Sequence, residues 1–259
     1  MTAQEDKETG QRLFKAGQYS DAIPLLKSAA EAFPKDESLW LDLVMAARDS
    51  SQHEQAVEFA KQAIRQHPRS DWLWRTLGGE LVATDRLDEA DKALNNARTM
   101  NPNAEWLWRH LAALHQKRKN LEKEIEALEK LFAIGEATST ELNELGIANY
   151  KHKNFAKALE YYRLSFEDDP SVYPLFNMGL VFNDPEVSQD ADAADAYRRA
   201  LALQSDYEPA KKMLDITKQK LVPLAERALE AATVLVQSED LFRFYVNPFE
   251  VLQIEEVDS

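Results

Sequence analysis

The sequence predicts an all-α protein in which helical hairpins stack into a solenoid. Three observations favour this fold class: prolines recur at a fixed interval, apolar residues follow them at helical spacing, and short polar segments separate the helices. Pro34, Pro68 and Pro102 lie 34 residues apart, and the next two steps reach Glu136 and Pro170. A period of this length indicates a repeat protein, in which each unit buries its apolar face against the next one.

Three further series keep the same register. They are the tryptophans Trp40, Trp74 and Trp108, continued by Leu142; the leucines Leu43, Leu77, Leu111 and Leu145; and the alanines Ala22, Ala56 and Ala90, broken at Glu124 and restored at Ala158. Small residues let two helices approach closely, so we expect looser packing at the glutamate. Proline ends each second helix because it cannot continue one.

The pattern of each unit predicts two helices joined by a short polar turn. Apolar residues of the third unit follow helical spacing in two runs, 74–81 and 87–97. The turns are "AGQYS", "DSSQH", "TDRLD", "KRKNL" and "KHKNF". A sixth unit, "YPLFNMGLVF" and "DAADAYRRALAL", has the longer turn "NDPEVSQDA", which predicts a protruding corner.

This pattern resembles the tetratricopeptide repeat (TPR) family over residues 3–204. The resemblance implies a right-handed α-solenoid of TPR helical hairpins with a C-terminal capping helix. The expected bounds are 3–36, 37–70, 71–104, 105–138, 139–171 and 172–204 for the repeats, 205–237 for the cap and 238–259 for an apolar tail. Within the cap, Pro223 is expected to break or kink the helix.

Composition excludes several classes of function. The formal charge of −14 argues against a nucleic-acid surface, and no apolar run reaches the ~20 residues that span a bilayer. The chain has no cysteine, and its start "MTAQEDKETGQ" lacks the apolar core of a signal peptide. We therefore expect a cytoplasmic protein. No catalytic motif, metal site or cofactor loop is present in the sequence, which predicts neither an enzyme nor a cofactor.

The TPR resemblance implies that the first helix of each hairpin lines a concave groove. Carried over position by position, it selects a set of candidate protein-binding residues. They are Leu41, Met45, Trp72, Arg75, Thr76, Trp106, Arg109, His110, Asn143, Tyr173 and Asn177.

Two of the repeats carry a duplicated Trp-Leu-Trp motif. The resemblance places Trp74 and Trp108 between the helices of a hairpin. Trp72 and Trp106, two residues earlier, point away from them by about 200° of helical rotation. These outer tryptophans are expected either to line the groove or to cover the edge of the preceding repeat.

An arginine follows each outer tryptophan by three residues. Arg75 and Arg109 are close enough to stack over the indole faces. They are equally placed to pair with Asp71 and Glu105 on the same helices. Aromatic and arginine side chains are the usual anchors of binding hot spots, so we expect this strip to bind a partner.

One TPR subclass grips the C-terminal carboxylates of chaperones with a clamp of Lys, Asn, Asn, Lys and Arg. Lys7 fits the first position, but Gln11, Asp42, Trp72 and Thr76 fill the others. An acidic residue in the groove would repel a carboxylate. The sequence therefore predicts no carboxylate clamp.

These features predict a module that binds a protein or peptide, acting as an adaptor or assembly scaffold. The tail is apolar as far as Ile254, and we expect it to dock on the solenoid. Its "NPFEVLQI" at 247–254 resembles the opening of a J domain but lacks the His-Pro-Asp triplet. A client-selecting part of a TPR/J-domain co-chaperone is thus the alternative, and self-association through the repeat ends is a third possibility.

Overall fold

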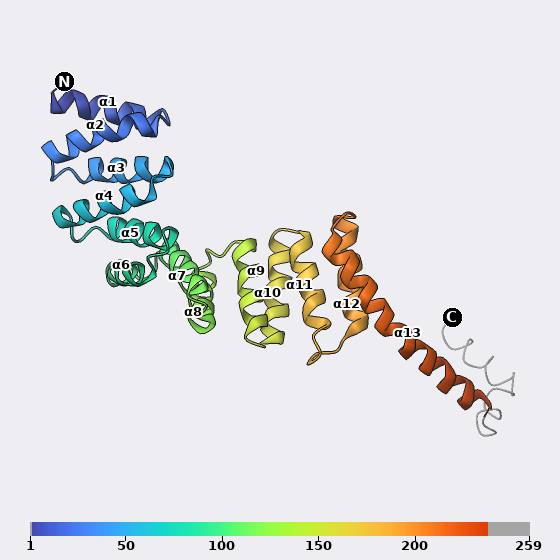
Figure 1. The fold of residues 1–259 in the computed structure, drawn as a ribbon. Coiled ribbons are helices and arrows are strands. Elements are labelled where there is room, and N and C mark those ends of the chain that lie inside the picture. The colour runs from blue at the N-terminus through green and yellow to red at the C-terminus, as the bar shows by residue number, and fades with distance from the viewer. Residues whose placement is uncertain (1, 238–259) are drawn as a thin grey trace, which may run out of the picture. The chain divides into compact units, whose positions relative to one another are not determined.

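The computed structural model describes residues 2–237, with side chains as far as residue 222 (Figure 1). Every regular element in that part of the chain is an α-helix. The chain divides into two compact units, Met1–Tyr161 and Tyr162–Ser259. The predicted all-α fold class is therefore confirmed.

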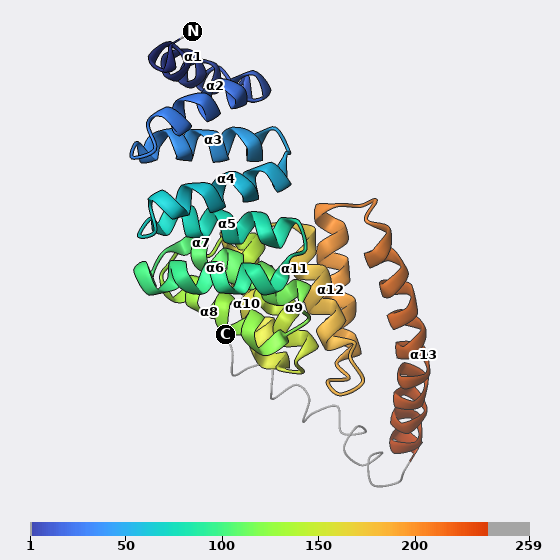
Figure 2. The same cartoon turned by 60° about the vertical axis from the view of Figure 1, so that its left-hand side comes forward.

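In the first unit, each helix packs against the next one along the chain, from α1 to α9. Both views show α1 to α6 following one another in a stack (Figures 1 and 2). The helices are α1 (Ala3–Lys15), α2 (Tyr19–Ala32), α3 (Glu37–Asp49), α4 (His53–Gln66), α5 (Asp71–Ala83), α6 (Leu87–Met100), α7 (Glu105–Lys117), α8 (Leu121–Ala133) and α9 (Ser139–Lys151), followed by α10 (Phe155–Asp168).

The turns inside the first five hairpins repeat one backbone conformation. The residues at its left-handed position stand 34 apart: Gly17, Ser51, Asp85, Lys119 and Lys153, with φ between 57° and 73°. In each turn the next amide donates to a carbonyl five residues back, at 2.8–3.0 Å. This bond satisfies one of the carbonyls left open at a helix end, so the left-handed conformation recurs although only the first turn has a glycine there.

The alanine series lies in the interior of the hairpins. Ala22, Ala56 and Ala90 are fully buried, as the sequence predicts. Glu124 occupies the same position of the next hairpin and is only 4% exposed. Burial raises the pKa of this carboxyl group, because the charged form is poorly solvated there. The fourth hairpin therefore buries an acid where the others bury a methyl group.

The proline and tryptophan series are linked by a hydrogen bond. The indole Nε1 of Trp40, Trp74 and Trp108 donates to the carbonyl of the proline six residues earlier, at 2.9–3.1 Å. Each bond fixes the entry of a first helix against the end of the preceding second helix. One tryptophan per repeat is thus explained by the fold itself.

The second unit begins within α10 and continues with α11 (Val172–Phe182), α12 (Asp190–Leu203) and α13 (Glu208–Gln237). Helix α12 packs against both α11 and α13. Nζ of Lys220 lies 2.7 Å from Oδ1 of Asn183, which attaches α13 to the long corner after α11. A break or a kink is expected at Pro223; α13 continues through this residue, so the helix is not broken there. Residues 238–259, with the predicted docking tail, lie outside the described residues.

Candidate functional site

Helices α5 and α7 hold an arginine between two tryptophans. Cζ of Arg75 lies 4.1 Å from the ring centroid of Trp106 and 5.5 Å from that of Trp72. Both distances are within the range of a cation–π interaction. All three side chains are partly exposed. The predicted stacking of Arg75 on an outer tryptophan is therefore confirmed, and the indole of the neighbouring repeat lies nearer than its own.

Two further side chains, the cation Arg48 and the imidazole of His110, interact electrostatically with Arg75. Burial lowers the pKa of Arg75, and the nearby charge of Arg48 on α3 adds to the effect. Burial, together with the charges of Arg75 and Arg48, lowers the pKa of His110 to about 4. His110 is therefore neutral at pH 7. Its ring packs against the bare backbone of Gly79, where an added Cβ would stand 2.8 Å from the imidazole.

Arg75 has no carboxylate within ion-pair distance among the described residues. Arg48, by contrast, pairs with Asp49 at 2.8 Å. Asp71 and Glu105 act on Arg75 only at longer range. The two indole faces and the longer-range charges of Asp71 and Glu105 stabilise this guanidinium, but no carboxylate contacts it, so its hydrogen-bond donors remain open to an acidic ligand. We name this surface, formed by Arg48, Arg75, Trp72, Trp106 and His110, the cationic face.

Arg109 has different contacts from Arg75, which is the equivalent residue one repeat earlier. Its Nε lies 2.7 Å from a carboxylate oxygen of Glu141 on α9, and an NH2 group donates to the carbonyl of Glu136 at 2.7 Å. Glu105 lies 3.7 Å away. The expectation that Arg109 stacks over an indole is therefore wrong, because the next repeat supplies an acid. The alternative, a pair with Glu105, is confirmed.

The remaining candidate binding residues differ in their exposure and belong to both units. Leu41 and Met45 on α3 and Asn143 on α9 are partly exposed, whereas Thr76 is only 5% exposed and offers a ligand little surface. Tyr173 is exposed and contacts Tyr207 edge to face in the second unit. Asn177 is partly exposed and belongs to the same unit.

An acidic hollow lies beside the cationic face, between α7, α8 and α9. Its volume is about 100 Å³, and Glu124, Glu141 and Glu144 line it together with Arg109. Burial raises the pKa of Glu144, and the charges of Glu141 and Glu124 raise it further. The first unit thus presents cations on α3 and α5 and acids on α8 and α9.

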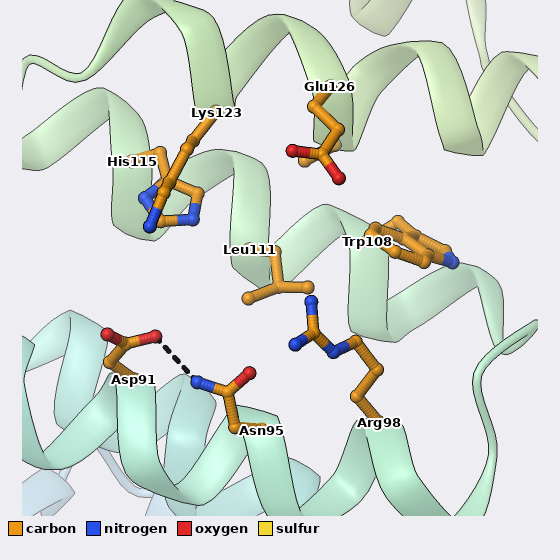
Figure 3. Close-up of a pocket in the computed structure, with 9 residues that line it drawn as sticks. Asp91, Asn95, Arg98, Trp108, Leu111, His115, Lys123 and Glu126 are labelled. Atoms are coloured by element: carbon orange, nitrogen blue, oxygen red, sulfur yellow. Dashed lines mark hydrogen bonds between the residues drawn. The ribbon is translucent and has the colours of Figure 1, made fainter.

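Two clefts between second helices were not anticipated from the sequence. The larger one, about 450 Å³, lies between α4 and α6 over Trp74. The smaller, about 190 Å³, lies one repeat later between α6 and α8 over Trp108 (Figure 3). Trp74 is partly exposed to the larger cleft, whereas Trp108 is buried, so the two equivalent tryptophans differ in exposure. A position-by-position comparison 34 residues apart is the signal that would have distinguished these two clefts.

Comparisons with known proteins agree with this architecture. The family model described as tetratricopeptide repeat matches residues 13–73 and 47–107. Among curated protein sequences none matches the chain. The solved structure of YrrB, described as a TPR protein with an unusual peptide-binding site, has a TM-score of 0.64 at 16% identity and covers 72% of this chain and 96% of its own.

Two further solved structures are similar over most of their length. PilF of Pseudomonas aeruginosa has a TM-score of 0.62 at 18% identity, covering 81% of this chain and 95% of its own. MamA of Desulfovibrio magneticus has a TM-score of 0.59 at 19% identity, covering 64% of this chain and 93% of its own. At such identities the likeness concerns the fold.

Fold and repeats together define a helical repeat protein of the solenoid class. The resemblance to the TPR family is confirmed, and residues 13–107 match the model of its repeat. Proteins of this class are typically interaction scaffolds. Among the described helices, none has the length and apolar character that crossing a membrane requires.

Proposed function

We propose that the cationic face binds a segment of a partner protein and that the chain serves as an adaptor or assembly scaffold. The observation that carries the proposal is Arg75, a partly buried cation between Trp72 and Trp106 with no carboxylate of its own in the described structure. The indoles hold the guanidinium in place, and no carboxylate in the described structure contacts it directly. A partner carboxylate would supply the missing charge.

The surroundings of Arg75 indicate the chemistry of that partner segment. Two indole faces, with Leu41 and Met45 on the preceding first helix, suit a leucine or an aromatic side chain next to the carboxylate. Glu144 lies further along, on α9, beside Glu141, whose carboxylate already pairs with Arg109. We therefore infer that the segment is dipolar, with its acid at α5 and a basic residue toward α9.

The likeness to YrrB supports this proposal only at the level of the fold. That protein is described as having an unusual peptide-binding site. We further propose six repeats with a helical cap at 205–237, and a cytoplasmic location consistent with the absence of cysteine. We propose no enzymatic activity.

A set of three peptides tests the proposal by fluorescence polarisation with the full chain. The first peptide carries two glutamates, two leucines and two lysines in that order. Its twin has glutamines in place of the glutamates, and the third has the reversed order. We expect the first to bind at least tenfold more tightly than either of the others, which is about 1.4 kcal/mol. Equal affinities for the first peptide and its amide twin would refute the proposal.

The co-chaperone alternative depends on the "NPFEVLQI" segment at 247–254. In that reading the repeats select clients and a J-like module follows the segment. Reading the native gene beyond the codon for Ser259 tests it directly. A His-Pro-Asp triplet in the expected helical context would favour the co-chaperone, and its absence would leave the adaptor.

A further inference from the structure

We propose that the cleft between α4 and α6 is a second docking site and that its occupant is the acidic, aromatic segment 238–259 of this same protein. The proposal is independent of the cationic face, because none of the residues that line the cleft belongs to that face. Its evidence is the chemistry of the floor, the charge of the rim and the composition of the segment.

The floor of the cleft is apolar and held in place. Leu77 and Leu81 are buried beneath it, with Ile64 and Ala93 at its sides. Trp74 is the exception, because its ring is partly exposed to the cleft. Its Nε1 donates to the carbonyl of Pro68 at 2.9 Å, so the polar edge of the indole is already satisfied. The exposed face of the Trp74 indole is therefore a fixed apolar surface on which another aromatic ring can pack.

The rim of the cleft is cationic. Lys61, Arg65 and Lys92 stand around it with a single acid, Glu89. That acid lies 3.1 Å from Lys61 and 2.7 Å from Arg86, so its charge is already balanced. Arg65 and Lys92 are exposed and have no ion-pair partner among the described residues. A positive rim around an apolar floor is unusual in a chain with a formal charge of −14.

The equivalent cleft one repeat later lacks this combination. It has the same floor tryptophan, Trp108, but His115 replaces Leu81 and Glu126 replaces Lys92. Polar side chains surround the space in Figure 3, and Asn95 donates to Asp91 at 2.9 Å. The repeat architecture alone therefore does not produce an apolar, cationic cleft.

The segment 238–259 is complementary to the first cleft. It contains Phe242, Phe244, Tyr245 and Phe249 within a stretch that has six acidic residues and one arginine. Aromatic side chains suit the floor over Trp74, and carboxylates suit Arg65 and Lys92. The contact can form within one chain or between two copies, and the occupant is the same in both cases.

Photo-crosslinking in the full chain tests the proposal. A benzophenone amino acid is placed at Phe244 in one sample and at Phe249 in another, and the cross-linked peptides are mapped by mass spectrometry. We expect cross-links to residues 61–65 and 89–96. Cross-links that fall elsewhere on the helices, or none from either position, would overturn the proposal.

Charge reversal on the rim provides the matched variants. Arg65→Glu with Lys92→Glu changes two exposed residues and should lower the cross-link yield at least fivefold without altering the helical circular-dichroism spectrum. Lys123→Glu, in the equivalent cleft over Trp108, is the control and should leave the yield unchanged. An equal loss in both variants would contradict the assigned site. A product of doubled mass would place the contact between two copies.

Discussion

Trp106 and Trp108 lie two residues apart on α7 but differ in what their indoles can do. Nε1 of Trp108 donates to the carbonyl of Pro102 at 2.9 Å, and its ring is only 8% exposed. Trp106 stays partly exposed and receives the guanidinium of Arg75 on its face. The first ring therefore stabilises a hairpin, whereas the second offers its surface to a partner.

Truncation of these two tryptophans should separate the two roles. We expect Trp108→Ala to lower the free energy of unfolding by about 3–5 kcal/mol, because it removes a buried ring and a hydrogen bond. Trp106→Ala should cost about 1–2 kcal/mol, since less of its surface leaves water on folding. Urea unfolding followed by circular dichroism measures both values. Equal losses would mean that Trp106 belongs to the core.

His110 gives the protein a pH dependence with a defined sign. Its pKa is lowered from 6.5 to about 4 in the folded chain, first by burial and then by the charges of Arg75 and Arg48. Between these two pH values the unfolded chain binds more protons, so acid favours unfolding. The stability that the neutral imidazole contributes is complete above about pH 6.5 and is lost as the pH falls toward 4.

Replacing this histidine should remove that part of the pH profile. Relative to His110→Gln, the native chain should lose up to about 3 kcal/mol of its stability between pH 7 and pH 4. Thermal unfolding at a series of pH values measures the difference. The control is His152→Gln, at an exposed position, which should leave the native profile unchanged. Parallel profiles for the native chain and His110→Gln would contradict the assignment.

At the scale of the element, each hairpin is built from the same few devices. A left-handed residue closes the turns of the first five hairpins, and an indole bonds to the preceding proline in the second, third and fourth. A buried alanine stands at the series position of the first, second, third and fifth hairpins, whereas in the fourth Glu124 takes that position and Gly135, with φ of 78°, follows α8. Its carboxyl group has a raised pKa, so it destabilises the fold in its charged form.

Glu124→Gln should therefore stabilise the protein at neutral pH. The folded carboxyl group holds its proton more strongly than the unfolded one, so the penalty grows as the pH rises through the ordinary value of 4.5. We expect a gain of about 1 kcal/mol at pH 7, or a few degrees in Tm, that disappears below about pH 4. Calorimetry at both pH values measures it. A gain that does not depend on pH would show that charge is not the cause.

Much of this element-level picture was accessible from the sequence. The proline, tryptophan and alanine series depend on contacts within a hairpin or to its neighbour, and these contacts recur at the repeat period. Arg109 and Trp74 could not be placed in this way. Arg109 is fixed by Glu141 of the next repeat, and the exposure of Trp74 depends on the space between α4 and α6. Where one residue differs from its equivalents in the other repeats, its position depends on contacts specific to that repeat, and the 34-residue period carries no information about those contacts.

At the scale of the whole molecule, the distribution of charge matters more than its sum. The chain has a formal charge of −14, yet Arg48 and Arg75 stand together on the first helices of its first unit. Glu141 and Glu144 follow on α9, where Glu141 pairs with Arg109 and Glu144 has no ion-pair partner among the described residues. A partner segment with separated charges can be guided into one orientation by such a pattern, and the effect should weaken as salt screens it.

The central claim is that Arg75 is positioned for a partner and not for the fold, and Arg75→Met tests it most directly. Methionine keeps the length of the side chain and packs well between the two indoles, while it removes a partly buried, unpaired charge. Measuring Tm and the affinity for the acidic peptide on the same sample separates the two roles. We expect an unchanged or higher Tm and an affinity at least tenfold weaker. A lower Tm with unchanged affinity would contradict the account and make Arg75 a structural residue.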